Sequence, residues 1–575
     1  MRDGGYLKRG DWPWLASLLL IGCLTLGVFA FTAYRFTDGQ GGVPLDDAWI
    51  HFQFARNLAR GDGFSFNPGH PTSGSTAPLW TLLLAAAYLV GGEFPVAGQL
   101  LSGACFLAAL AVTYALGKQL TGSRWAAWLA GAVVATNGRM VWAGLSALEV
   151  GLFATLSLLA IGSYLRDRAT RHYRLRTAAL FGLAALSRPE GYLLFALSLA
   201  DFTWNSCRRP EKAAAGGHVL RITHYALRTR ITLRRLPLLP VVLFAAIVLP
   251  YLVFALHTSG HLLPNTYHAK AVVNFRLNRD FLSMAARYLI RDNPLLLPFY
   301  VLGVGVLLFP ALSGSTVQLS GSAEASTLSS AEVLAKVSPK GHASLLSLWS
   351  VGLPLVYAFL LAVLYQHGRY LIPLIPCNAV IGVVGLLEAR RLLLRRGYRW
   401  AASLLAPLPP LVGEGRGGVG RGARRGLVAL VSLIVVAGTC WRLPAMARLY
   451  ARNVDNINEM QVALGHWVTE HTPPDATLGL NDIGAITYIS GRPVMDLVGL
   501  ITPEVLPLLR VPDRDTHLAD FMAERDVQYV IIFPNWFPGL AARRDLLEPV
   551  HRVTLEHNTI CGGQTMVVYR THWHR

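Results

Sequence analysis

Charged residues are scarce in this chain of 575 residues. Asp, Glu, Lys and Arg make up 15% of it, hydrophobic residues make up 53%, and the mean hydropathy is +0.41. A soluble globular domain carries about a quarter charged residues. Cysteine is scarce as well: the six cysteines form no CxxC pair, zinc-ligand spacing or disulfide framework. The sequence therefore gives no support to zinc or redox chemistry, and its composition is that of a membrane protein.

Long apolar runs stand where charge is missing, and a helix needs roughly 20 apolar residues to cross the hydrocarbon core. We predict a polytopic α-helical membrane protein with about 10 to 13 transmembrane helices. A shorter double run at 178–204 is broken by Arg188-Pro189-Glu190, which predicts a hairpin of two short helices. The longer runs lie at 12–33, 76–92, 98–117, 125–142, 148–165, 237–257, 293–311, 344–364, 371–388 and 427–441. We interpret the first run as an uncleaved helix and not as a signal peptide.

The net charge of +19 is unevenly distributed. Residues 1–440 hold 40 Lys and Arg against 18 Asp and Glu, and three loops at 166–176, 205–236 and 389–426 hold 22 of those 40 basic residues. Such clusters are typical of cytoplasmic loops. We therefore expect a multi-pass protein of the cytoplasmic membrane without a nucleic-acid partner. Segments 46–60 and 258–292 then lie on the outer face.

The composition changes near residue 442, beyond which 12 basic residues face 15 acidic ones. We expect a membrane domain over 1–441 and a small extracytoplasmic α/β domain over 442–575. The pattern predicts strands at 476–481, 527–533 and 565–570 and a helix at 513–526. Asp496 follows a predicted strand, where it can contact a ligand or stabilise a turn.

Two adjacent acids, Asp46 and Asp47, lie just after the first apolar run in LDDAWIHFQFARNLARGDGFSFNPG (45–69). Asp46 is suited to be an N-cap and Gly61 to be a C-terminal stop, so we predict a juxtamembrane helix at about 46–60. Apolar residues recur at every fourth position, so one side of this helix should lie in the membrane interface while arginines reach toward lipid headgroups (Ile50, Phe54 and Leu58; Arg56 and Arg60).

Two readings of the acid pair remain open. Capping and the helix dipole explain one acid well, but either residue would suffice for them. A carboxylate at a partly dry interface is also a suitable general base for attack of a sugar hydroxyl on an anomeric carbon.

The stretch at 46–69, followed by HPTSGSTAPLW (70–80), resembles the GT-C membrane glycosyltransferases. LSRPEG (186–191), LPNTYHAK (263–270) and HGRYLIPLIP (367–376) are similar to the same superfamily, as is DIGAITYISGRPVMDLVGL (482–500). The resemblance is to the terminal arabinofuranosyltransferase branch and, more distantly, to protein O-mannosyltransferases and aminoarabinose transferases. His51 and Gln53 depart from the branch pattern, as does the turn Ser73-Gly74-Ser75-Thr76, which leaves the sugar undefined.

The resemblance implies that the donor is a sugar on a polyprenyl phosphate and that the acceptor is an envelope glycan, lipid or protein. It implies that Asp46 is the general base, with Asp47 contacting the sugar or the acceptor. No cofactor is expected. Two adjacent aspartates make a poor metal site, because consecutive helical residues point about 100° apart, and we expect transfer without a metal.

Cations beside the departing phosphate should assist the leaving group. Lys270 and Arg369 are candidates because the topology places both on the face that bears Asp46, although interfacial anchoring explains a single Lys or Arg equally well. Arg188 lies inside an apolar hairpin, where charge is costly, and it contacts either phosphate or Glu190. The remaining candidates are His268, His367 and Tyr370, with Glu149 a weaker one.

A membrane transporter or flippase is the alternative function. Transporters usually carry ionisable groups at mid-bilayer on broken helices and often show internal repeats. In this sequence the distinctive polar residues cluster at the outer edge, apart from Arg188 and Glu190, and no repeat is evident. A third possibility is an envelope scaffold whose outer domain binds partners without catalysis.

Overall fold

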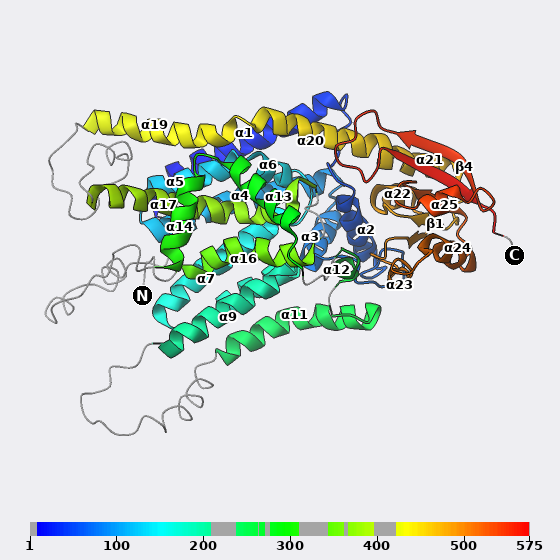
Figure 1. The fold of residues 1–575 in the computed structure, drawn as a ribbon, viewed down its shortest axis with the longest axis horizontal. Coiled ribbons are helices and arrows are strands. Elements are labelled where there is room, and N and C mark those ends of the chain that lie inside the picture. The colour runs from blue at the N-terminus through cyan, green and yellow to red at the C-terminus, as the bar shows by residue number, and fades with distance from the viewer. Residues whose placement is uncertain are drawn as a thin grey trace, which may run out of the picture.

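The computed structural model describes residues 8–208, 237–262, 264–270, 276–309, 343–361, 366–395 and 421–573. The side chains of residues 206–208, 268, 270 and 421–429 lie outside this description, as do most of the basic loops 205–236 and 389–426. A bundle of helices forms one end of the molecule and a small sheet domain forms the other (Figure 1). The short helix α2 (Asp47–Arg60) lies between the two.

Six helical segments of the described chain are long and apolar enough to cross a membrane. They are Arg9–Phe36, Val96–Thr121, Val150–Thr170, Leu238–Ser259, Gln366–Arg395 and Leu430–His471. The bent pair α13 (Arg279–Asp292) and α14 (Leu297–Leu308) counts as a seventh if it is one span, and four helices of 10–17 residues are also apolar. The predicted class of polytopic helical membrane protein is confirmed. The total of about 10 to 13 spans stays a prediction.

The bundle is built from apolar helices, and glycines permit its closest contacts. Its other main helices are α3 (Pro78–Leu89), α4 (Val96–Thr121), α5 (Arg124–Ala135), α6 (Gly138–Gly144), α7 (Val150–Thr170), α11 (Leu238–Ser259), α16 (Ser344–Leu360), α17 (Ile375–Arg395) and α19 (Arg421–Cys440). A Cβ on Gly385 would lie 1.8 Å from the carbonyl oxygen of Phe299, so α14 and α17 approach each other at this glycine. The predicted hairpin is confirmed as α8 (Leu175–Ser187) and α9 (Glu190–Arg208), separated at Arg188-Pro189.

The C-terminal domain contains a five-stranded sheet in the order β2-β1-β3-β5-β4. The strands are β1 (Leu478–Leu480), β2 (Val494–Asp496), β3 (Tyr529–Ile532), β4 (Leu547–Thr554) and β5 (Thr565–Thr571), and α24 (Arg514–Glu524) packs beside them. Strands β2, β1 and β3 are parallel, whereas β5 pairs antiparallel with both β3 and β4. The predicted strands at 476–481, 527–533 and 565–570 are therefore present. The division of domains at residue 441 stays a prediction.

Helix α2 differs from the expected interfacial helix. It ends at Gly61, whose φ of 91° is left-handed as predicted for a C-cap. Phe54 is fully buried against the core of the sheet domain, and Arg56 donates a hydrogen bond of 2.8 Å to the carbonyl oxygen of Tyr488. The expectation that this face lies among lipids is wrong, because the C-terminal domain covers it. Helix α22 (Gly484–Ser490) provides the covering surface.

Candidate active site

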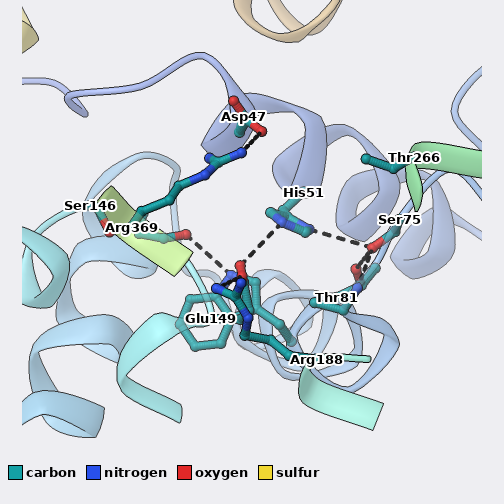
Figure 2. A network of polar contacts seen from close by, with 12 residues as sticks. Asp47, His51, Ser75, Thr81, Ser146, Glu149, Arg188, Thr266 and Arg369 are labelled. Atoms are coloured by element: carbon teal, nitrogen blue, oxygen red, sulfur yellow. Dashed lines mark hydrogen bonds and ion pairs between the residues drawn. The ribbon is translucent and has the colours of Figure 1, made fainter. Parts of the chain in front are cut away.

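A cavity of about 340 Å³ opens beside the first turn of α2. Four separate parts of the chain build its polar wall: the start of α2, the residue before α7, the break between α8 and α9, and the 3₁₀ segment η4 (Gln366–Leu374). The charged and ring side chains on this wall are those of Asp47, His51, Glu149, Arg188, Glu190, Arg369 and Tyr370. Figure 2 shows most of them pointing toward one another.

Asp47 and Arg369 form an ion pair at the mouth of this cavity. The Arg369 Nη2 lies 2.8 Å from the Asp47 Oδ1, as Figure 2 shows. The Asp47 side chain remains 27% exposed, whereas that of Arg369 is only 8% exposed. A carboxylate that is accessible and a guanidinium that is held in place therefore face the same space. The second is suited to grip a phosphate with two parallel N–H donors.

Deeper in the cavity, Arg188 is held by two carboxylates. Its Nη2 lies 2.7 Å from the Glu190 Oε1, and its Nη1 lies 3.2 Å from the Glu149 Oε1. The hydroxyl of Tyr357 also donates to Glu190. Arg188 therefore forms the expected ion pair with Glu190 and also lines the cavity, while its contact with a phosphate stays a prediction. Burial of such a network is costly unless each charge is paired, and here the arginine is fixed by its partners.

His51 lies one helical turn after Asp47 and points into the same cavity. Its Nε2 lies 3.6 Å from the Glu149 Oε2, and its Nδ1 lies 3.5 Å from the Ser75 Oγ. Sequence reasoning noted His51 only as a departure from the family pattern and ranked Glu149 as a weak candidate. The helical spacing of His51 from Asp47 was the available signal, because residues four apart share one face.

Much of the rest of the cavity lining is apolar. Helix α16 contributes most of it, together with the start of α9. The aliphatic side chains are those of Leu148, Leu193, Leu353, Val356, Leu360 and Leu361. The cavity therefore combines charged and hydrocarbon-like lining.

Asp46 does not line this cavity. Its side chain is buried, and its two carboxylate oxygens accept hydrogen bonds of 2.8 Å from the backbone N–H groups of Gly484 and Ala485 at the start of α22. Burial, and then the charge of Asp482, raise the pKa of Asp46 well above its ordinary value. The structure thus places Asp46 in a contact between the start of α2 and the start of α22.

The other predicted site residues are distributed differently. Tyr370 lines the cavity beside Arg369. His367 faces away from it and forms a hydrogen bond of 2.9 Å between its Nε2 and the Asn453 Oδ1. His268 and Lys270 belong to α12 (Asn265–Lys270), two residues of which also line the cavity, but their side chains lie outside the described part of the structure.

Across the described ranges, no group of three or more His, Cys, Asp or Glu side chains is arranged to hold a metal ion. Transfer without a metal stays a prediction. Asp496, the other open question, is resolved: its carboxylate accepts hydrogen bonds from the backbone N–H groups of Val498, Leu500 and Ile501 and therefore stabilises a turn.

This arrangement of helices and sheet is similar to the fold of ArnT in two crystal structures. A crystal structure of ArnT from Cupriavidus metallidurans in the apo state is similar to 96% of this chain over 97% of its own length, with a TM-score of 0.53 and 15% identity. The structure of ArnT bound to undecaprenyl phosphate gives a TM-score of 0.52 at 13% identity, with coverages of 96% and 98%.

Two further comparisons gave one weaker structural similarity and one match to part of the chain. The arabinofuranosyltransferase AftD from Mycobacteria has a TM-score of 0.48 at 14% identity, and the match covers 99% of this chain and 42% of AftD. A family model described as a domain of unknown function (DUF8728) matches residues 452–570. No curated protein sequence matches the chain.

Proposed function

We propose that this protein is a glycosyltransferase that moves a sugar from a polyprenyl phosphate to a hydroxyl group of an envelope glycan, lipid or protein. The reaction would take place on the outer face of the cytoplasmic membrane. One observation carries the proposal: a single cavity joins the Asp47–Arg369 pair to an apolar wall on α16. A donor with a charged phosphate and a hydrocarbon chain has the same two-sided character. ArnT, which shares the fold, has been crystallised with undecaprenyl phosphate.

Arg369 is the proposed phosphate ligand, with Tyr370 beside it. Arg369 is neutralised by Asp47. An arriving phosphate would compete for the same guanidinium, and this exchange would release the Asp47 carboxylate. Arg188 keeps its own carboxylate partners and would support the phosphate from the deeper side of the cavity. Lys270 remains a candidate second phosphate ligand, with His268 beside it.

Asp47 is the proposed general base in place of Asp46. The acceptor oxygen attacks the anomeric carbon, and the bond between that carbon and the phosphate oxygen breaks with its electron pair leaving on the phosphate. The acceptor hydroxyl proton passes to Asp47. Asp47 suits this role because it is the accessible acid of the pair, while the oxygens of Asp46 are occupied by backbone N–H groups.

The matched variants D47N and D46N test the assignment. Both substitutions keep the shape of the side chain and remove one carboxylate. A difference between the two variants therefore shows which carboxylate the reaction needs. We expect D47N to lower transfer from radiolabelled polyprenyl-phosphate sugars by roughly 10²-fold or more, because general base catalysis contributes that much. D46N should lower the unfolding temperature and leave the turnover per folded molecule much less affected. Full activity in D47N would overturn the proposal.

Undecaprenyl phosphate carries no sugar, so its binding tests the phosphate site independently of the identity of the transferred sugar. We expect R369Q to weaken this binding by about tenfold, since a hydrogen bond between charged groups is worth about that much.

Liposomes containing the purified protein test the alternative function. Movement of a labelled lipid across the bilayer without sugar transfer would favour a flippase.

A further inference from the structure

A second cavity, of about 170 Å³, lies on the other side of the turn that precedes Arg369. It is formed where α13 ends, where α6 begins, and where α19 passes into α20 (Leu443–Ile457). It shares no lining residue with the proposed active site. Its polar lining consists of Asn137, Arg139, Tyr288, Arg291, Asp292, His367, Thr439 and Arg442.

The cavity carries an excess of positive charge. Arg139 is fully engaged: it contacts Asp292 at 2.8 Å, donates to the carbonyl oxygens of His367 and Gly368 at 2.8 Å each, and lies 4.3 Å from the centre of the Tyr288 ring. Asp292 is the only carboxylate among the described lining residues, and Arg139 neutralises it.

Two further guanidiniums line this cavity, and Asp292 attracts one of them, that of Arg442, at a longer range than Arg139. Arg291 is exposed and Arg442 is half-buried, and both line it. Arg442 lies 5.5 Å from the Trp441 ring. Paired guanidiniums of this kind are suited to bind a phosphate, because each presents planar N–H donors.

Two lining residues of the cavity, Thr439 and Arg442, belong to the helical segment Leu430–His471, which is long and apolar enough to cross a membrane. Trp441 directly follows the apolar helix α19 and is 66% exposed, as expected for an aromatic residue at the interface. The lipid-exposed side of α19 carries Leu433 and Ile434. An interfacial Trp441 would bring the guanidiniums of Arg291 and Arg442 to the level of the lipid headgroups.

An apolar crevice adjoins the cationic cavity. The two share Asn137 and Asp292, and the crevice is otherwise walled mainly by apolar residues of α13, α14, α5 and α17, including Leu289, Leu296 and Ile375. It is narrow, at about 30 Å³. This volume is about that of one water molecule, so the crevice has room for only the first one or two methylene groups beside a headgroup.

We propose that this pair of cavities is a binding site for the phosphate headgroup of an anionic glycerophospholipid in the outer leaflet. Arg291 and Arg442 bind the phosphate, and the start of an acyl chain lies against the crevice. The site is separate from the proposed donor cavity. Its occupation by lipid does not depend on the glycosyltransferase function.

Binding of fluorescent phosphatidylglycerol to the purified full-length protein in detergent tests the site, with phosphatidylcholine as the reference lipid. We expect R291Q/R442Q to weaken phosphatidylglycerol binding by roughly tenfold or more, since at least one charged hydrogen bond is lost. The control R448Q/R452Q removes the same charge from exposed positions of α20 outside the cavity. It should change binding by less than about twofold.

The remaining outcomes are decisive as well. Equal losses in the two double variants would overturn the proposal, because binding would then follow net charge alone. Displacement of the lipid by inorganic phosphate would overturn it in favour of a soluble anion. The single variant R442Q serves if the double variant does not fold, and it should then show the larger part of the loss. Transfer activity does not enter the measurement, so this result and that of D47N are independent.

Discussion

At the scale of single residues, two adjacent aspartates have different surroundings. Asp46 and Asp47 stand at the start of a helix, where consecutive side chains point about 100° apart. One therefore meets Arg369 in the cavity and the other meets the N-terminus of α22. Gly484 is required at this contact, because a Cβ there would lie 2.3 Å from the backbone oxygen of Asp46.

The buried acid predicts a dependence of stability on pH. The pKa of Asp46 is raised by burial and by Asp482. A raised pKa in the folded state stabilises the protein below the ordinary value, near 3.8, and this contribution is lost as the pH rises through the raised value. The variant D482N removes the repulsion. We expect D482N and the unmodified protein to have the same unfolding temperature near pH 4. As the pH rises, D482N should become the more stable of the two, by about 1 kcal/mol or more in unfolding free energy.

Thermal unfolding in detergent across this pH range measures the difference. D475N is the control, because Asp475 is an exposed acid of the same domain. A gap between D482N and the unmodified protein that stays constant with pH would contradict the role of Asp46. A gap that D475N reproduces would show a general effect of charge.

The sequence singled out the acid pair but could not predict that only Asp47 lines the cavity. Nothing local distinguishes the two residues, since the partners of Asp46 lie 438 and 439 positions away. Arg188 and Arg369 were found because charge in or beside an apolar run is rare. His51 was missed as a site residue because a histidine near the membrane has many ordinary explanations.

At the scale of elements, the turn before Arg369 is unusual. Gln366, His367 and Gly368 all have positive φ, at 33°, 56° and 70°. Such a conformation costs of order 1 kcal/mol or more for each residue that is not glycine. The hydrogen bonds from Arg139 to the carbonyl oxygens of His367 and Gly368 hold the turn in place. This turn sets the position from which Arg369 reaches Asp47.

The variant G368A tests the turn. Alanine in a left-handed conformation costs roughly 1 to 2 kcal/mol, so we expect relaxation of the turn, displacement of Arg369 and a several-fold loss of transfer together with weaker binding of undecaprenyl phosphate. G61A is the matched control. Gly61 also has positive φ, but it caps the C-terminal end of α2, whereas Asp47 lies at the N-terminal end. Both variants should lose similar thermal stability. Equal loss of transfer in both would contradict the positioning role.

Local signals predicted elements better than they predicted surroundings. Pro189 and its charged neighbours interrupt an apolar run, and the helix break falls there. Strand β2 has only three residues, so the sequence indicated its end at Asp496 but not its bounds. Strand β4 was missed because most of its residues are exposed or half-buried. The amphipathic pattern of α2 was read correctly as a helix, but the sequence cannot say whether lipid or protein covers its apolar face.

At the scale of the whole molecule, the sheet domain and the bundle share α2. Helix α20 continues from α19 and packs against α1 (Trp12–Phe36), so the chain passes from the membrane part into the sheet domain without a flexible linker (Figure 1). Phe54, Arg56 and Asp46 bind α2 to the sheet domain, while Asp47 and His51 face the bundle. The proposed base is therefore positioned by both parts.

The apolar wall of the proposed donor cavity gives a final prediction, because it decides whether the donor is a lipid. Val356 and Leu355 are neighbours on α16, but only Val356 lines the cavity, while Leu355 is 45% exposed on the outer side of the helix. We expect V356W to raise the KM for a long-chain polyprenyl-phosphate donor about tenfold or more, because the indole occupies space that the hydrocarbon needs, with a smaller effect on a short-chain donor. L355W adds the same ring to the same helix outside the cavity and should leave both KM values nearly unchanged. If V356W affects the long and short donors equally, the wall does not hold the prenyl chain, and the cavity binds only the polar part of its substrate.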